Sequence, residues 1–108
     1  MDNAFEARKK KFEDKWAHDE ELRFKIGARR NKLLGLWAAA ELGLSGPAAD
    51  DYASAVVTAD LQGGDSMFRK LRADFDAAKL GHSDHVIQHR MAELLMEAAD
   101  QIMHETKG

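Results

Sequence analysis

Apolar residues recur at spacings of three and four along four stretches of the chain, a period typical of amphipathic helices. The first stretch follows Asp19, a residue type that caps helix N-termini, and Gly43 is placed to end it in a left-handed cap. Its apolar positions are Leu22, Ile26, Leu33, Trp37 and Ala40, with Phe24, Leu34 and Leu36 beside them. The pattern predicts one long helix between Asp19 and Gly43, with Trp37 in the core.

The other three stretches are separated by short turns. The second follows Ser45-Gly46-Pro47, because proline is favoured in the first turn of a helix, and Ser83 is placed to cap the fourth. The breaks between them are Gln62-Gly63-Gly64 and Leu80-Gly81-His82. The inner positions are Ala49, Tyr52, Ala53, Val56, Val57 and Leu61, then Met67, Phe68, Leu71, Phe75 and Ala78, then Ile87, Met91, Leu94, Leu95, Ala98 and Ile102. Short connections favour a compact all-α four-helix bundle over residues 19–108.

Residues 1–18 have a different pattern, dense in charge with few apolar groups. Phe5, Phe12 and Trp16 are seven and four residues apart, which places them on one face of a helix. An isolated helix of this length is marginal in water, so the segment is either a frayed terminus or an arm that folds on a partner. We predict a mobile, amphipathic N-terminal arm whose aromatic face nothing in its own chain covers. Its removal should leave the stability of the bundle nearly unchanged.

Composition narrows the class of protein. The chain has 108 residues, no cysteine and a net charge of −3, which fits one domain without disulfides, thiolate metal sites or a cysteine nucleophile. Residues 1–18 carry five Lys and Arg against four acids, and the remainder carries 11 against 15, so neither part has the basic character of a nucleic-acid binder. Neither a membrane span nor a signal peptide is visible in the sequence, so we expect a cytoplasmic protein without direct membrane insertion.

Two polar groups are candidates for binding chemistry. The basic cluster Arg29-Arg30-Asn31-Lys32 interrupts an apolar-periodic helix and suits either an anion contact or an ordinary solvent face. His85 and His89 are spaced to share a helix face, with His82 nearby, but the pattern forces no further ligand into place. We expect surface or capping histidines, no metal, no catalytic residue and no enzymatic activity.

Two runs in the sequence carry a family resemblance: Phe12-Glu13-Asp14-Lys15-Trp16-Ala17-His18-Asp19-Glu20-Glu21-Leu22 and Ala28-Arg29-Arg30-Asn31-Lys32-Leu33-Leu34-Gly35-Leu36-Trp37-Ala38-Ala39. They resemble the zeta subunit of alphaproteobacterial F-type ATP synthase, an intrinsic inhibitor of ATP hydrolysis. Tyr52-Ala53, Val56-Val57 and the closing Gln101-Ile102-Met103 are similar to later helices of that family. The resemblance covers nearly the whole chain.

The resemblance implies a four-helix bundle with an inhibitory arm, similar in role to the mitochondrial ATPase inhibitor protein. The arm would enter the interface between a catalytic beta subunit and its alpha neighbour, reach the gamma stalk and block rotation in the hydrolytic direction. The implied partner-binding residues are the apolar anchors Phe5, Phe12 and Trp16 and the polar contacts Arg8, Lys9, Lys11, Glu13 and Lys15. The protein would be a monomer when free, and it would bind peripherally to the membrane-bound ATP synthase.

Two departures and two alternatives accompany this resemblance. Trp16 stands where the family has Phe or Tyr, and the run Arg8-Lys9-Lys10-Lys11 is more basic than the usual arm. One alternative is a regulatory module that binds ATP or ADP weakly through Arg29, Arg30 and Lys32, with no other cofactor. The other is a metal-dependent enzyme built on the histidines.

Overall fold

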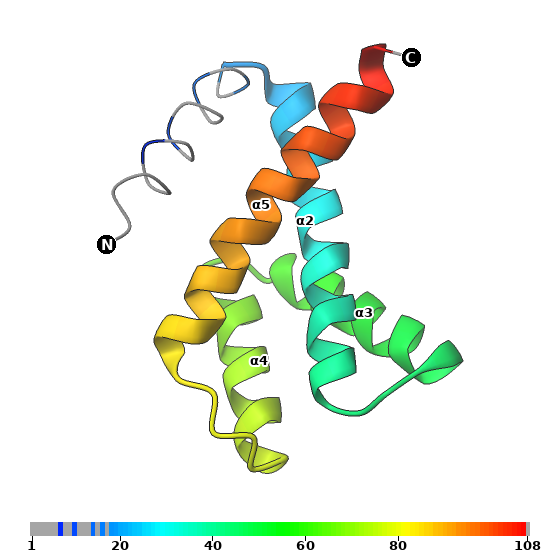
Figure 1. Cartoon of the computed structure of the whole chain (residues 1–108), viewed down its shortest axis with the longest axis vertical. Helices are drawn as coiled ribbons and strands as arrows, with labels where there is room; N and C mark the ends of the chain where they lie inside the picture. The colour runs from blue at the N-terminus through cyan, green and yellow to red at the C-terminus, as the bar shows by residue number, and fades with distance from the viewer. Residues whose placement is uncertain (1–6, 8–9, 11–13, 15, 17, 108) are drawn as a thin grey trace.

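The computed structural model describes residues 7, 10, 14, 16 and 18–107, with side chains through Glu105. Within these residues the chain forms four helices and no strand, which confirms the predicted all-α four-helix bundle. The helices are α2 (Glu20–Glu41), α3 (Gly46–Asp60), α4 (Ser66–Ala77) and α5 (Asp84–Lys107), as Figure 1 shows. None of the described helices is long and apolar enough to cross a membrane.

The predicted ends of α2 are confirmed in detail. The Asp19 carboxylate accepts a hydrogen bond of 3.1 Å from the backbone N–H of Leu22, which satisfies one of the free donors of the first turn. At the other end Gly43 has φ of 82°, and the N–H of Leu44 reaches back to the carbonyl of Ala39 at 2.8 Å. This backbone pattern is the left-handed cap that the glycine predicted.

The ends of the later helices are confirmed in part. Pro47 lies in the first turn of α3, and the Ser83 hydroxyl accepts a hydrogen bond from the N–H of Val86 at 3.2 Å. The end of α4 differs from the prediction, because Lys79 holds the left-handed position with φ of 59°. The N–H of Leu80 then donates to the carbonyl of Phe75 at 3.1 Å, so the helix closes two residues before Gly81.

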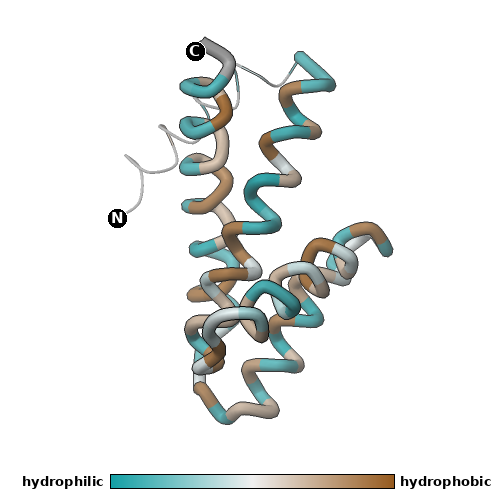
Figure 2. Tube along the Cα trace, turned by 90° about the vertical axis from the view of Figure 1, so that its right-hand side faces the viewer, coloured by the Kyte–Doolittle hydropathy of each residue, from teal (hydrophilic) through white to brown (hydrophobic). Residues whose placement is uncertain are grey.

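The helices build two apolar clusters. Figure 1 shows the C-terminal half of α5 beside the N-terminal half of α2, with α4 and most of α3 toward the other end of the molecule. The tube in Figure 2 shows hydrophobic and hydrophilic positions alternating along the described helices, as amphipathic packing requires. The buried members of the main cluster are Leu34, Ala38, Val56, Met67, Leu71, Phe75, Ile87 and Leu94. The second cluster, at the α2–α5 end, comprises Trp16, Ile26, Ala98, Ala99 and Ile102.

Four predicted inner positions are wrong. Phe24 is 76% exposed and Leu61 is 81% exposed, and Ala40 and Ala78 also face solvent. The reason in α2 is that the helix packs against both α3 and α5, so its buried arc is broad and includes Asn31 and Gly35 in place of Phe24 and Ala40. Leu61 is exposed because it is the C-cap residue of α3, where the chain already turns away from the helix.

Trp37 packs against the main cluster but keeps part of its surface exposed. Its ring meets Phe75 edge to face, with 5.6 Å between the ring centroids. The Arg90 guanidinium lies 5.5 Å from the centre of the same indole. Trp37 therefore belongs to the edge of the core, which is a shallower position than the sequence predicted.

Candidate functional site

Most of the predicted partner-binding residues lie outside the described part of the chain. These are Phe5, Arg8, Lys9, Lys11, Phe12, Glu13 and Lys15. Trp16 is described, and it is 8% exposed. Trp16 lies where the predicted arm joins the bundle.

Trp16 packs into the cluster at the α2–α5 end. Its buried neighbours there are Ile26 from α2 and Ala98, Ala99 and Ile102 from α5, with Leu22, Leu33 and Leu95 packed around them. The expectation that the aromatic face is left uncovered by its own chain is therefore wrong for Trp16. The sequence signal that points to this contact is the pair of small residues Ala98-Ala99, which leaves room on α5 for a large ring.

The indole N–H of Trp16 is buried and has no acceptor among the described residues. A buried tryptophan usually finds a partner for this donor, and leaving it unpaired costs about 1–3 kcal/mol. The apolar contact of the ring thus favours burial of the Trp16 side chain, whereas the unpaired N–H donor disfavours it.

Arg29 fastens α2 to α5 beside this cluster. Its guanidinium donates to the Gln101 amide oxygen at 2.7 Å and to both Glu105 carboxylate oxygens at 2.8 and 2.9 Å. The Arg29 hydrogen bond lowers the pKa of Glu105 below its ordinary value of 4.5, and the same bond raises the pKa of Arg29. We call this set of contacts the α2–α5 clasp.

Arg30 takes part in a different contact, between α2 and α3. Its Nε–H donates to the Asn31 side-chain oxygen at 2.8 Å, and the Asn31 amide donates to the Asp60 carboxylate at 2.8 Å. Asn31 is the one buried polar residue among those described. Burial lowers the pKa of Arg30, and the charge of Asp60 opposes that shift. The hydrogen bonds that link Arg30, Asn31 and Asp60 satisfy polar groups that the contact between α2 and α3 would otherwise bury unpaired.

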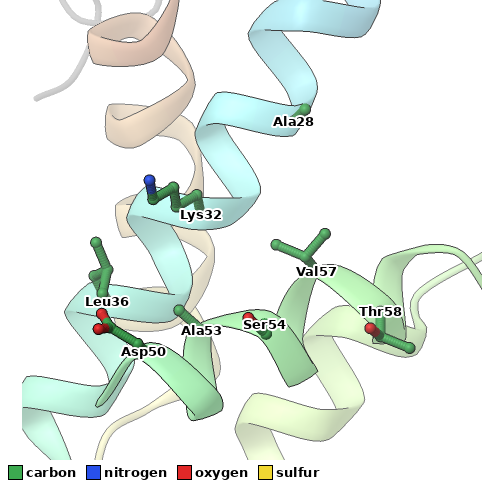
Figure 3. Close-up of a pocket in the computed structure, with 8 residues that line it drawn as sticks. All are labelled: Ala28, Lys32, Leu36, Asp50, Ala53, Ser54, Val57 and Thr58. Atoms are coloured by element: carbon green, nitrogen blue, oxygen red, sulfur yellow. The ribbon is translucent and has the colours of Figure 1, made fainter. Parts of the chain in front are cut away.

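Lys32 faces a third environment, an open groove of about 650 Å³ between α2 and α3. Figure 3 shows its lining residues, with Ala28, Lys32 and Leu36 on α2 and Asp50, Ala53, Ser54, Val57 and Thr58 on α3. The three basic residues of the predicted nucleotide contact therefore lie in different environments and do not form one site. Two are engaged in contacts between helices, and Lys32 alone lines the groove.

The histidines are likewise divided between two places. His82 Nε2 lies 2.7 Å from Glu41 and its ring packs 5.0 Å from Phe75, which ties the α4–α5 turn to the end of α2. The His85 and His89 rings lie 6.0 Å apart on α5, and His89 is 3.5 Å from Glu93. The described part of the chain contains no group of three or more side chains arranged to hold a metal ion.

The fold and these contacts define a small all-α bundle, onto which an aromatic residue preceding the first helix of the bundle is packed. The chain belongs to the ATPase inhibitor subunit zeta family, whose model matches residues 1–101. This match confirms the family resemblance of the sequence and places the chain among inhibitor subunits that associate with the ATP synthase. A search of curated proteins found no match.

Proposed function

We propose that this protein inhibits ATP hydrolysis by the F-type ATP synthase through residues 1–18. In this proposal the arm folds as a helix into the interface between a catalytic beta subunit and its alpha neighbour and blocks rotation of gamma. The observation that carries the proposal is the family match, which runs through the arm as well as the bundle. The protein acts as a binding subunit without catalytic residues, peripheral on the membrane-bound enzyme and monomeric when free.

The composition of the arm supports this mechanism physically. A helix laid into a groove binds through residues three, four and seven apart, and Phe5, Phe12 and Trp16 have this spacing. An arm that becomes ordered on binding loses conformational entropy, so a few large apolar anchors must offset that cost. The interleaved cations of the arm then supply the polar rim that surrounds such anchors.

A test compares two phenylalanines. ATP hydrolysis by an isolated bacterial F-type catalytic head is measured with increasing wild-type protein, with Phe12→Ala and with Phe24→Ala. Phe24 is the matched control, because it is an exposed phenylalanine on α2 outside the arm. Truncating an anchor at the centre of an interface commonly weakens binding by about 2 kcal/mol or more, so Phe12→Ala should raise the half-inhibitory concentration by at least about tenfold. Phe24→Ala should inhibit like the wild type.

Two results would contradict the proposal. Absence of inhibition by the wild-type protein would contradict the proposed inhibitory function itself. Loss of inhibition in Phe24→Ala with full inhibition in Phe12→Ala would move the inhibitory surface from the arm to the bundle.

A second candidate function is binding of adenine nucleotide in the groove between α2 and α3. Lys32 supports it, because this cation lines the groove with the hydroxyl-bearing Ser54 and Thr58 and has no ion pair to any residue the structure describes. Calorimetry with ATP and ADP on the wild type, Lys32→Gln and the control Lys25→Gln tests it. Binding that Lys32→Gln alone weakens supports the site, and binding that neither variant changes contradicts it.

A further inference from the structure

We propose that Trp16 is a latch that holds the end of the arm on the bundle, and that inhibition requires its withdrawal from the α2–α5 cluster. This inference rests on the proposed function, since it concerns how the same arm is made available to the ATPase. The latch is the packing of the Trp16 indole against Ile26, Ala98, Ala99 and Ile102.

The shape of this end of the bundle explains why Trp16 docks there. Among the described helices, Figure 1 shows α2 and α5 side by side at this end, with most of α3 and α4 toward the other end. Two helices cover each other on one side only, so the apolar positions of the second cluster need a further covering group. Trp16 supplies it, and Ala98 and Ala99 have no side chain beyond Cβ to obstruct the ring.

The contact is built so that it can open. The buried indole N–H has no described acceptor, and this desolvated donor works against the docked state, whereas release returns it to water. The apolar area of the ring favours docking and the unpaired donor favours release, so the two states lie closer in free energy than the burial of the ring alone would give.

Opening need not disturb the bundle. The link to α2 is short, with the Asp19 N–H donating to the Trp16 carbonyl at 3.1 Å, while the Asp19 side chain caps α2 independently. The α2–α5 clasp also remains, because Arg29 lies one turn from Ile26 and its partners Gln101 and Glu105 flank Ile102. The pocket therefore stays assembled when the ring leaves.

A docked Trp16 competes with the proposed use of the arm. If the competent state is the one with Trp16 released, the apparent affinity for the ATPase is reduced by the fraction of molecules in that state. Weakening the pocket without changing the arm should consequently strengthen inhibition. A residue with a merely structural role would show the opposite effect or none.

The experiment uses two equal truncations on α5 in the full chain. Ile102→Ala removes part of the Trp16 pocket, and Ile87→Ala makes the same change in the main cluster, away from Trp16. We measure inhibition of an isolated bacterial F-type catalytic head, together with helix content by circular dichroism. In a Trp37→Phe background Trp16 is the only tryptophan, so its fluorescence reports exposure of the indole.

The latch predicts that Ile102→Ala shifts Trp16 emission to the red and lowers the half-inhibitory concentration about three- to tenfold. Ile87→Ala should change neither quantity while the helices remain. If either alanine variant loses its helices, the pair Ile102→Val and Ile87→Val replaces it, and Ala99→Leu, which fills the pocket, gives an independent release of the ring.

The outcomes separate the latch from the function on which it rests. A wild-type protein that does not inhibit overturns both proposals. A wild-type protein that inhibits, with Ile102→Ala and Ala99→Leu no better than the wild type, overturns the latch alone. Equal strengthening by Ile87→Ala also overturns it, because general loosening of the bundle would then be the cause.

Discussion

Lys79 ends α4 in a left-handed backbone conformation, with φ of 59°. For an L-residue with a side chain this conformation costs about 1–2 kcal/mol, and at the end of a helix glycine normally adopts it. The sequence offers Gly81 two residues later, but the Phe75 carbonyl is already satisfied by the N–H of Leu80. The helix thus ends at the position that packs Leu80, partly buried, against the main cluster, at some cost in backbone strain.

Lys79→Gly should therefore stabilise the protein. Relief of the strain exceeds the larger chain entropy that glycine adds to the unfolded state, so the expected net gain is about 0.5–1 kcal/mol. For a domain of this size the melting temperature should rise by about 2–6 °C. Lys79→Ala is the control, since it removes the same charge and keeps the strained φ. If both variants melt at the same temperature, strain at residue 79 is not the cause.

The sequence predicts the burial of a side chain well only where a single packing surface can cover it. Ile26, Leu71 and Ile87 lie on clear stripes and are fully buried. Trp16 is ambiguous in the sequence, because an aromatic face on a short helix fits an external groove and its own bundle equally well. Asn31 could not be predicted as buried, since its place depends on Asp60 of another helix approaching within hydrogen-bond distance.

At the scale of helices, the contact between α2 and α3 depends on Gly35. A Cβ added there would lie 2.7 Å from the Ala53 Cα, a separation that real structures do not tolerate. The two backbones therefore approach at this point because neither residue has a large side chain. The sequence shows Gly35 only as a weak helix former, so the close contact is a finding of the fold.

Two glycine substitutions in α2 should have opposite effects. Gly27→Ala meets no atom within 4 Å and should stabilise the helix by about 0.5–1 kcal/mol. Gly35→Ala gains the same helix propensity but must push α3 away, with an expected net loss of about 1–2 kcal/mol. Urea unfolding of the two variants and the wild type measures the change in the free energy of unfolding, which should be positive for Gly27→Ala and negative for Gly35→Ala. Stabilisation by Gly35→Ala would mean that α3 shifts freely on α2.

The α2–α5 clasp should weaken in acid. The folded-state pKa of Glu105 lies below its ordinary value of 4.5, so the clasp stabilises the protein above that pH and is lost as the pH falls through the lowered pKa. Glu105→Gln should melt below the wild type at pH 7, and the difference should shrink as the pH falls below 4.5. The difference is expected to be small, because Glu105 is exposed and its ion pair is screened by water. A difference that does not change with pH would mean that the carboxylate charge of Glu105 contributes nothing.

Helix boundaries are the part of the fold that the sequence predicts best. Asp19, Gly43 and Ser83 act locally, through hydrogen bonds to residues at most five positions away. The buried face of α2 is harder to predict, because two different helices cover it from two sides. The candidate nucleotide contact is harder still, since neighbours such as Arg29 and Arg30 leave a helix in different directions.

At the scale of the whole molecule, the boundary between arm and bundle is a matter of packing. The first helix of the bundle begins at Glu20, but the second apolar cluster includes Trp16. A division at residue 18 follows the helix start, whereas a division at residue 15 keeps the cluster intact. The two divisions predict different stabilities for shortened chains, which makes the boundary measurable.

Deletion of residues 1–15 and deletion of residues 1–18 should separate inhibition from stability. Both remove Phe5 and Phe12 and should abolish inhibition of the catalytic head. Deletion of 1–15 retains Trp16 and should melt within about 2 °C of the full chain, since a gain or loss of a few tenths of a kcal/mol shifts the melting temperature by that much. Deletion of 1–18 uncovers Ile26, Ala98 and Ile102 and should lose about 2–4 kcal/mol, somewhat less than truncation of a fully satisfied buried tryptophan.

Full-length Trp16→Ala is the control that assigns this loss to the indole. It should melt near the 1–18 deletion, although it keeps the rest of the arm. If deletion of 1–18 leaves the melting temperature unchanged, Trp16 adds no stability to the bundle and the whole of residues 1–18 is an independent arm. If deletion of 1–15 already lowers the melting temperature to the value of the longer deletion, the arm needs its earlier residues to hold Trp16 in place. Agreement of the 1–15 deletion with the wild type, and of the 1–18 deletion with Trp16→Ala, fixes the boundary at Trp16.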